Sequence, residues 1–355
     1  MPGARWEIPD WPRYLGQPDS TATLRATPED FQVWELPLVE PAGAGSHLWV
    51  ELRKREANTQ WVAARLAEAA GVPLRDVGFA GMKDRHAVTT QWFSVGLQEA
   101  ANADWDSWDI PGATILQAQR HGRKLQRGAL RGNRFRIVLR DLRGATDTLQ
   151  NRLSTVAARG VPNYFGPQRF GRDGGNVERA AHWLERGGRI KRNLRSVYLS
   201  AARSYLFNGL LAERVRRGDW NRLVDGDVAM LDGSRSTFAC ALPDEQLESR
   251  CAGFDIHPTG PLPGRDSKRS RAGPGGEAAV LEEQALGSHA ALVEALKRAG
   301  VDADRRSLRV LPDGLEWDLK SSALVLEFTL PPGAYATSIL RELVLTGPGT
   351  ISEDR

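Results

Sequence analysis

The chain has 355 residues, which is longer than a single hydrophobic core usually grows, so we expect one large domain and a smaller one. Its residues are 41% hydrophobic and 26% charged, with no long apolar run and no signal peptide, which argues against a membrane protein and indicates a cytoplasmic one. The net charge of +4, with 41 Arg against 7 Lys, is compatible with a polyanionic partner and equally with codon bias.

The first hundred residues combine several strands with one helix. β-Branched and aromatic residues predict strands at Phe31 to Glu35, His47 to Leu52 and Gln91 to Val95. Between the second and third of these, apolar residues recur at helical spacing from Asn58 to Ala70 and stop at Gly71, as expected for a helix that ends at a glycine.

A short turn before the third strand contains the sequence GMKDR, with Lys83, Asp84 and Arg85 in succession. A carboxylate on such a turn is presented to a cleft, and its cationic neighbours favour the charged form. The alternative is an Asp that merely closes the turn, and for an isolated GxKD tetrapeptide this alternative is favoured. The choice between them depends on the other segments of the chain.

A basic run follows between Arg120 and Arg136, where seven Arg or Lys and one His occur without an acidic residue. Such a run is commonly a solvated face. Here it leads into a strand predicted at Phe135 to Arg140, in which apolar residues at 135, 137 and 139 alternate with arginines at 134, 136 and 140, with one apolar exception at Val138. A strand with one apolar and one basic face can track a phosphate backbone, so we expect nucleic-acid contact here.

The remainder of the chain again mixes helices and strands. Apolar spacing predicts helices at 147–159, 177–186, 199–217 and 288–299, and β-branched and aromatic residues predict a strand at 323–330. The Pro-, Gly- and Ser-rich stretch Pro258 to Glu277 is expected to be a mobile surface loop. Without a regular βαβ rhythm, the pattern favours an α+β fold with a mixed, largely antiparallel sheet flanked by helices. No GxGxxG, P-loop, HExxH or GxSxG motif is present.

The segment VPNYFGPQRFGRDGGN, Val161 to Asn176, permits two interpretations. Its Asn, Gln, Arg and Asp side chains would suit a polar active site. Its aromatic rings, Tyr164, Phe165 and Phe170, lie among glycines and would equally pack a domain junction. We favour packing and leave the segment out of the catalytic set.

Several segments together resemble one family. ATPEDFQVWE (26–35), the Asp84 turn, the NYFG segment and LPPGAYATSILREL (330–343) are similar, in this order, to the four signature regions of the TruD family, tRNA pseudouridine synthases that act on uridine 13. RGALRGNRFRIVLR (127–140) and LSAARSYLFN (199–208) also resemble it, so the match covers essentially the whole chain. The resemblance implies a pseudouridine synthase fold with a catalytic domain at 1–158 and 306–355 and an inserted α/β TRUD domain at 159–305.

The resemblance also implies roles for individual residues. Asp84 falls on the catalytic aspartate, Phe31 and Asn133 on substrate-contacting positions, and Phe135 on an aromatic that lines the uracil pocket.

Two further site residues depart from the family pattern. Tyr335 stands where a Phe is common, which keeps the ring and adds a hydroxyl. Arg25 stands where a Lys often pairs with the catalytic Asp, and its rigid fork would hold the carboxylate differently. Both departures concern geometry and leave the implied reaction intact.

The implied reaction breaks the N1–C1′ bond of uridine and joins C5 to C1′, with no cofactor and no metal. The cysteines, Cys240 and Cys251, agree with this, since neither lies in a CxxC motif or a cluster with His. Asp84 would act as nucleophile at the sugar or the base, or remove a proton to form a glycal-like intermediate, on a uridine flipped out of its stack. We expect a monomer that binds tRNA and no membrane. The alternatives are a catalytically silent tRNA-binding or folding protein and a ribonucleoside hydrolase.

Overall fold

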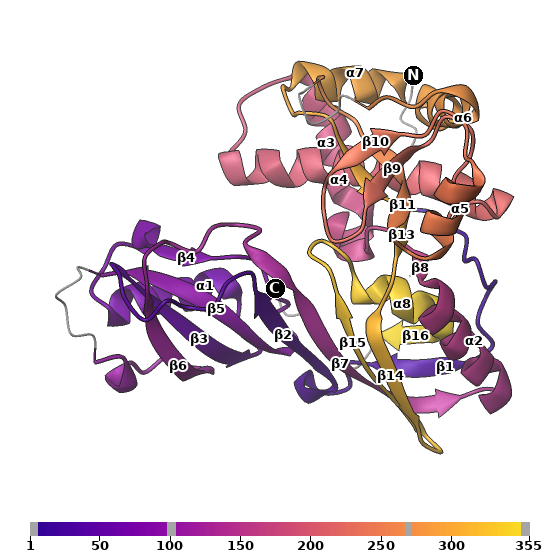
Figure 1. Ribbon diagram of the computed structural model, residues 1–355. Coiled ribbons are helices and arrows are strands. Elements are labelled where there is room, and N and C mark those ends of the chain that lie inside the picture. Colours follow the sequence, from indigo (N-terminus) through magenta and orange to yellow (C-terminus); the bar gives the residue numbers. More distant parts are fainter. Residues whose placement is uncertain (1–5, 98–103, 267–271, 349–355) are drawn as a thin grey trace. The chain divides into compact units, whose positions relative to one another are not determined.

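The computed structural model describes residues 6–97, 104–266 and 272–348, and its contacts divide the chain into two compact units (Figure 1). We call the first the sheet unit; it comprises Asp19–Asn151, Pro312–Gly333 and Val344–Arg355. We call the second the helical unit; it comprises Met1–Pro18, Arg152–Leu311 and Ala334–Leu343. Among the described residues, no helix has the length and apolar character needed to cross a bilayer.

The sheet unit is built on a ten-stranded sheet in the order β14-β15-β7-β2-β5-β3-β6, with β1 beside β7 and β16, and β4 beside β5. Among the described strands, only β2 with β5 and β1 with β16 pair in parallel. The α+β fold with a mixed, largely antiparallel sheet that the sequence predicted is therefore confirmed. The strands are β1 Thr21–Leu24, β2 Phe31–Pro37, β3 His47–Arg55, β4 Val77–Phe79, β5 Val88–Gly96, β6 Ala113–His121, β7 Leu130–Arg143, β14 Asp313–Leu319, β15 Ala323–Leu330 and β16 Leu345–Pro348.

Two helices begin in the sheet unit. In α1, Thr59–Ala69, the side chain of Asn58 accepts a hydrogen bond from the Gln60 N–H and so caps the N-terminus. Val62 and Leu66 are fully buried in a core that β3, β4 and β5 share, as the apolar spacing predicted. The second helix, α2, Thr146–Arg159, crosses the boundary between the units. Short 3-10 turns, η1 Pro28–Asp30, η2 Leu74–Asp76 and η3 Trp105–Ser107, connect the strands.

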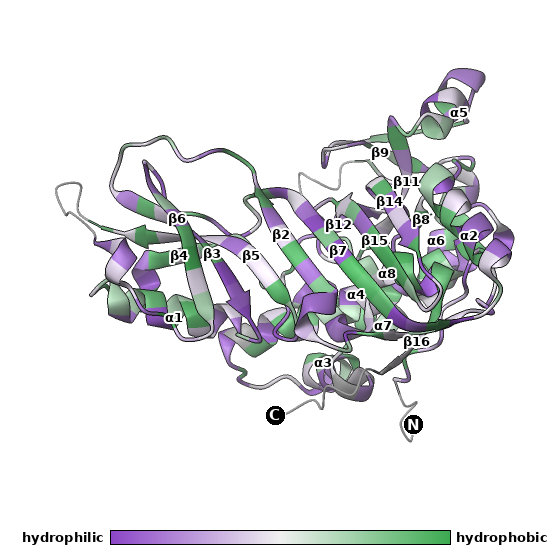
Figure 2. Cartoon of the chain, turned by 90° about the horizontal axis from the view of Figure 1, so that it is seen from below, coloured by the Kyte–Doolittle hydropathy of each residue, from purple (hydrophilic) through white to green (hydrophobic). Residues whose placement is uncertain are grey.

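The three adjacent strands β2, β7 and β15 place alternate residues on one face. Residues 31, 33 and 35 of β2 lie opposite 137, 135 and 133 of β7, and residues 326, 328 and 330 of β15 complete the row. Along β7, Phe135, Ile137 and Leu139 are buried, as predicted. The banding of polar and apolar residues along β2 and β7 is visible in Figure 2. Because β7 begins at Leu130, before the predicted start at Phe135, the face extends to Asn133.

In its described residues, the helical unit combines α3 to α8 and the second half of α2 with a four-stranded antiparallel sheet, β10-β9-β11-β12, and the short pair β13-β8. Its central helix, α4, packs on α3, α6 and β11. The helices are α3 Gly175–Arg186, α4 Arg192–Arg217, α5 Glu245–Ala252, α6 Gly276–Gly287, α7 Ala290–Arg298 and α8 Ala336–Leu343. The strands are β8 Val161–Pro162, β9 Val228–Leu231, β10 Thr237–Ala239, β11 Ile256–Leu262, β12 Asp304–Ser307 and β13 Arg309–Val310, with 3-10 turns η4 Pro167–Arg169 and η5 Arg172–Gly174.

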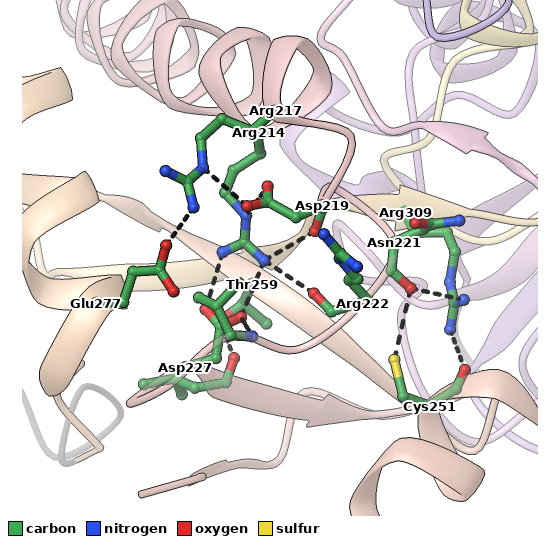
Figure 3. A network of polar contacts seen from close by, with 12 residues as sticks. Arg214, Arg217, Asp219, Asn221, Arg222, Asp227, Cys251, Thr259, Glu277 and Arg309 are labelled. Atoms are coloured by element: carbon green, nitrogen blue, oxygen red, sulfur yellow. Dashed lines mark hydrogen bonds and ion pairs between the residues drawn. The ribbon is translucent and has the colours of Figure 1, made fainter. Parts of the chain in front are cut away.

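A buried ionic network fixes the end of α4 (Figure 3). Arg214, which is 2% exposed, donates to Asp219 at 2.8 Å and to both carboxylate oxygens of Asp227 at 3.1 and 3.0 Å. Arg217 extends the network from Asp219 to Glu277 on α6. Because each buried charge has a partner, the network satisfies groups that would otherwise destabilise the core.

The prediction of a surface loop from Pro258 to Glu277 is wrong for the first part of this segment. Residues 258–262 belong to β11, which lies between β9 and β12, and Pro258, Thr259 and Gly260 are buried. A Cβ at Gly260 would lie 3.0 Å from Leu308 and 3.1 Å from Phe207, so the glycine permits close packing against α4. Residues 267–271 of the expected loop lie outside the described residues.

The compact units have boundaries that differ from the expected domains. The N-terminal segment, the second half of α2 and the segment 334–343 all belong to the helical unit. Arg152 on α2 holds these pieces together, because it donates to the carbonyl oxygens of Leu15, Gln17 and Glu342 at 2.8 to 3.0 Å. β14, β15 and β16 return to the sheet unit. The assignment of a catalytic and an inserted domain stays a prediction.

Candidate active site

Asp84 lies on the turn between β4 and β5, and its carboxylate is bound by a guanidinium. Arg25 Nη2 donates to Asp84 Oδ2 at 2.5 Å, while 39% of the Asp84 side chain stays exposed. The Arg25 guanidinium also lies over the Phe31 ring, with Cζ 4.2 Å from the centroid. Arg25 itself has a φ of 59°, a left-handed conformation that costs about 1–2 kcal/mol in a non-glycine residue. The charge pair is therefore held by a strained residue that directly follows β1, and it remains open to solvent on the Asp84 side.

The main chain of Asp84 is held by a buried lysine that the sequence did not reveal. Lys54 on β3 is fully buried, and its Nζ donates to the carbonyl oxygens of Ala57 at 2.7 Å and Asp84 at 2.9 Å. Burial lowers the pKa of Lys54 to about 8, an effect that the charge of Asp84 opposes and that of Lys83 increases. Lys54 thus connects the end of β3 to the peptide that carries the candidate catalytic carboxylate.

Lys83 makes a different contact from the one expected. We expected Lys83 to act as a charged neighbour of Asp84, but its ammonium forms an ion pair with Glu35, and the two side chains are 6% and 1% exposed. The Lys83 N–H also donates to Thr59 Oγ1 at 3.0 Å, and Thr59 donates to Gln91 at 3.0 Å. Thr59 holds the main chain at Lys83 and Lys54 holds it at Asp84, so the turn is anchored at two consecutive residues.

Aromatic rings and one amide lie along the face formed by β2, β7 and β15. Phe31 and Phe135 meet edge to face with centroids 6.1 Å apart, and Phe328 stacks on Phe135 at 5.4 Å. Asn133 is two residues from Phe135 on the same face, and its Oδ1 is buried without a hydrogen-bond partner among the described residues. An unsatisfied amide oxygen beside an apolar wall is suited to accept a hydrogen bond from a ligand.

The structure thus places Arg25, Phe31, Asp84, Asn133 and Phe135 in one compact unit. Asp84, Arg25 and Phe31 are in consecutive contact, and Phe135 touches Phe31. Tyr335 is not part of this cluster. It belongs to the helical unit, where its hydroxyl accepts hydrogen bonds from Arg169 and its ring meets Phe165 at 6.0 Å.

A hollow of about 310 Å³ lies on the opposite face of the same strands. Gln32, Arg136 and Val138 line it, and these residues alternate along β2 and β7 with the buried ones. Asp30 at its edge is paired with Arg140 at 2.8 Å. The hollow therefore belongs to the back of the sheet and not to the Asp84 site.

Cations of the predicted basic run lie at the start of β7 and in the turn before it. Arg123 is exposed, as are Arg127 and Arg134, which stack on aromatic rings: their Cζ atoms lie 3.8 Å from the Phe79 centroid and 4.7 Å from the Trp34 centroid. Partial burial lowers the pKa of Arg127. Stacking keeps these guanidiniums at fixed positions on the surface.

The aromatic rings of the NYFG segment pack in the core of the helical unit, and the domain junction that we favoured for them stays a prediction. Tyr164, Phe165 and Phe170 are buried in one cluster with Phe207 on α4. Among its polar residues, Asn163 bonds to the main chain at Ser307 with a distance of 3.0 Å.

Comparison with known proteins identifies the family. The model of the family described as tRNA pseudouridine synthase D (TruD) matches residues 13–188 and 187–343. The tRNA pseudouridine synthase D of Methylococcus capsulatus is 48% identical over 341 residues, which cover 96% of this chain and 95% of that protein. That of Nitrosococcus oceani is 46% identical over 340 residues, 94% and 93% of the two chains. The chain belongs to the TruD family. The family that the sequence motifs resemble is thereby confirmed.

The TruD fold is also found among solved structures. The crystal structure of a putative tRNA pseudouridine synthase D from Methanosarcina mazei superposes with a TM-score of 0.69 and covers 97% of this chain and 98% of that one. At 22% sequence identity the likeness concerns the fold.

Sequence reasoning missed three groups in this TruD chain: Lys54, Glu35 and Phe328. Phe328 could have been found, since the alternation in 323–330 puts it on the buried face of a predicted strand. No local pattern indicated that Lys54 and Glu35 are buried, because a charged residue in a strand pattern normally faces water.

Proposed function

We propose that the protein isomerises uridine 13 of tRNA to pseudouridine, with Asp84 as the catalytic carboxylate and without a cofactor. Membership of the TruD family supports the reaction and the substrate class. The observation that carries the assignment of Asp84 is its contact with Arg25 at 2.5 Å beside the buried ring of Phe31, while much of the carboxylate stays accessible. A guanidinium in hydrogen-bond contact stabilises an ionised carboxylate.

The proposed isomerisation depends mainly on that carboxylate. The N1–C1′ bond of the target uridine breaks, the base rotates, and C5 bonds to C1′; C5 loses a proton and N1 gains one, so the composition of the nucleotide is unchanged. Asp84 supplies an anionic oxygen, either as a nucleophile at the sugar or the base, or as the base that removes a proton to give a glycal-like intermediate.

We propose that the target uridine contacts the face formed by β2, β7 and β15. Phe31 and Phe135 form an apolar wall for a uridine flipped out of its stack. Asn133 Oδ1, buried without a partner among the described residues, would accept a hydrogen bond from uracil N3–H. Arg25 and Tyr335 complete the proposed substrate-binding set.

The proposal also covers the domain organisation, the oligomeric state, the cellular compartment and the surface that contacts tRNA. We assign catalysis to residues 1–158 and 306–355, with 159–305 as an insert. The protein would act as a monomer in the cytoplasm, where its tRNA substrate is found, and the basic run from Arg120 to Arg136 would contact tRNA phosphates.

The function is tested with purified protein and two tRNA transcripts that differ at position 13, uridine in one and cytidine in the other. Pseudouridine should form only in the first, without release of free uracil. Release of uracil would indicate the hydrolase instead, and tight tRNA binding without either product would indicate the silent RNA-binding protein.

Asp84→Asn tests the catalyst. The substitution keeps the size of the side chain and removes the charge and the nucleophilic oxygen, so turnover should fall below detection. Affinity for tRNA should stay within about tenfold, because phosphate contacts and base stacking determine most of it. Pseudouridine formation near the wild-type rate by Asp84→Asn would remove Asp84 from the mechanism.

A further inference from the structure

Two guanidiniums of the helical unit lie against one aromatic ring. Arg169, in η4, and Arg306, on β12, have their Cζ atoms 5.5 and 4.1 Å from the centroid of Phe165. The two Cζ atoms are therefore within about 10 Å of each other. Both side chains are partly exposed, and both carry a positive charge beside the same ring.

The hydrogen bonds of Arg169 all go to neutral oxygens. Nε and Nη2 donate to the Tyr335 hydroxyl at 3.0 and 2.7 Å, and Nη1 donates to Ser200 Oγ at 2.6 Å. No carboxylate lies within ion-pair distance of Arg169 among the side chains that the structure describes. The three bonds occupy one hydrogen on each nitrogen, which leaves a second N–H on both Nη1 and Nη2.

Arg306 is oriented by a neighbouring amide. Its Nε donates to the carbonyl oxygen of Asn163 at 3.2 Å and its Nη2 to Asn163 Oδ1 at 2.5 Å. Burial lowers the pKa of Arg306 to about 10, and the positive charge of Arg169 adds to this effect. Like charges at this separation repel, so an anion placed between them would be stabilised by both.

We propose that Arg169 and Arg306 form a binding site for a phosphodiester group of RNA. The planar fork of a guanidinium fits two phosphate oxygens, and both forks here are fixed in advance by hydrogen bonds and by the Phe165 ring. Tyr335 acts in this site through its hydroxyl, which holds the Arg169 fork. The inference rests on the proposed function, which makes tRNA the ligand, and adds a phosphate site on the helical unit to it.

The site is tested by measuring tRNA affinity over a salt series for the wild type, Arg169→Gln, Arg306→Gln and the double variant. Each single variant should weaken binding about tenfold and reduce the slope of log K against log salt by roughly one. The double variant should lose less than the product of the two single losses, because both guanidiniums contact the same phosphate. Arg169→Lys should keep the salt slope and lose part of the affinity, since it retains the charge without the fork.

Arg298→Gln is the matched control. Arg298 is an exposed cation at the end of α7 in the same unit, and its removal should leave affinity and slope unchanged. Equal losses in Arg298→Gln and Arg169→Gln would overturn the proposal in favour of a general charge effect, and a folded Arg169→Gln with wild-type affinity and slope would overturn it outright. If Arg306→Gln does not fold, Arg169→Gln decides alone. In either case, a wild type that still makes pseudouridine leaves the proposed function standing; a wild type that does not bind tRNA removes both.

Discussion

Lys54→Met should lower kcat by about a hundredfold while the fold and the affinity for tRNA change little. Lys54 touches no group of the proposed reaction; it fixes the carbonyl oxygen of the residue that carries the carboxylate, at 2.9 Å, and that of Ala57, at 2.7 Å. Without these bonds the Asp84 turn can shift by about 1 Å, and a displacement of that size costs about 10²-fold in rate. KM should move far less than kcat.

The small effect on stability follows from two opposing contributions. Each hydrogen bond from the ammonium to a carbonyl contributes about 1.5 kcal/mol, so Lys54→Met loses about 3 kcal/mol. Burial lowers the pKa of Lys54 from 10.5 to about 8, which corresponds to about 3 kcal/mol of cost for keeping the charge inside, and the methionine removes that cost. The free energy of unfolding should therefore change by no more than about 1–2 kcal/mol.

The pH dependence of stability gives an independent measurement. The folded chain releases the Lys54 proton at about pH 8, whereas the unfolded chain keeps it until about pH 10.5, so the unfolded state binds more protons between these values. The free energy of unfolding of the wild type should receive a contribution that rises with pH across this window, and Lys54→Met should lack it.

Val95→Ala serves as the control for lost stability. Val95 is fully buried in the same unit at the end of β5 remote from the turn, and the substitution should cost about 2 kcal/mol without changing kcat. If folded Lys54→Met keeps kcat within about threefold of wild type, or if Val95→Ala lowers kcat equally, Lys54 has no positioning role.

Charge reversal of Arg123 and Lys124 should weaken binding of any tRNA similarly and flatten its salt dependence; unchanged binding would make the basic run a solvated face. Glu35→Gln should destabilise the fold by about 3–5 kcal/mol, as it leaves the ammonium of Lys83 buried without its partner, and chemical denaturation would show this. Burial raises the pKa of Glu342 to about 7, so the folded state binds the proton more strongly and stability should fall as pH rises from about 4.5 to 7. Melting curves of Glu342→Gln should lack that decline; an identical pH dependence in both proteins would refute it.

The local pattern of apolar and polar residues was enough to predict many of the helices and strands near the site. The alternation in 135–140 predicted β7 with its correct buried face, a strand was predicted at 323–330, where β15 lies, and the apolar spacing of 58–70 predicted α1. Each of these patterns depends on residues a few positions apart, whose faces are set by the period of a strand or a helix. The Asp84 turn was placed for the same reason, since it had to lie between two such elements.

The same reasoning failed where long-range packing overrides composition. The segment from Pro258 has the proline and glycine content of a loop, yet it forms β11 because neighbouring strands pair with it on both sides and α4 requires a small residue at Gly260. Lys54 and Glu35 have the charge of surface residues and are buried because hydrogen-bond and ionic partners come from distant parts of the chain.

The sequence by itself therefore determined the family, the main periodic elements and the candidate carboxylate. The family resemblance also predicted Arg25 beside that carboxylate, whereas the tertiary structure alone decided the other groups that hold its turn, Lys54 and the Lys83–Glu35 pair. Arg25, Asp84 and Phe31 meet because β1, β2 and the β4–β5 turn belong to one sheet unit, while Tyr335 joins Arg169 in the helical unit. Strand register and side-chain partners across dozens of residues depend on the packing of the whole unit, and no local period in the sequence encodes them.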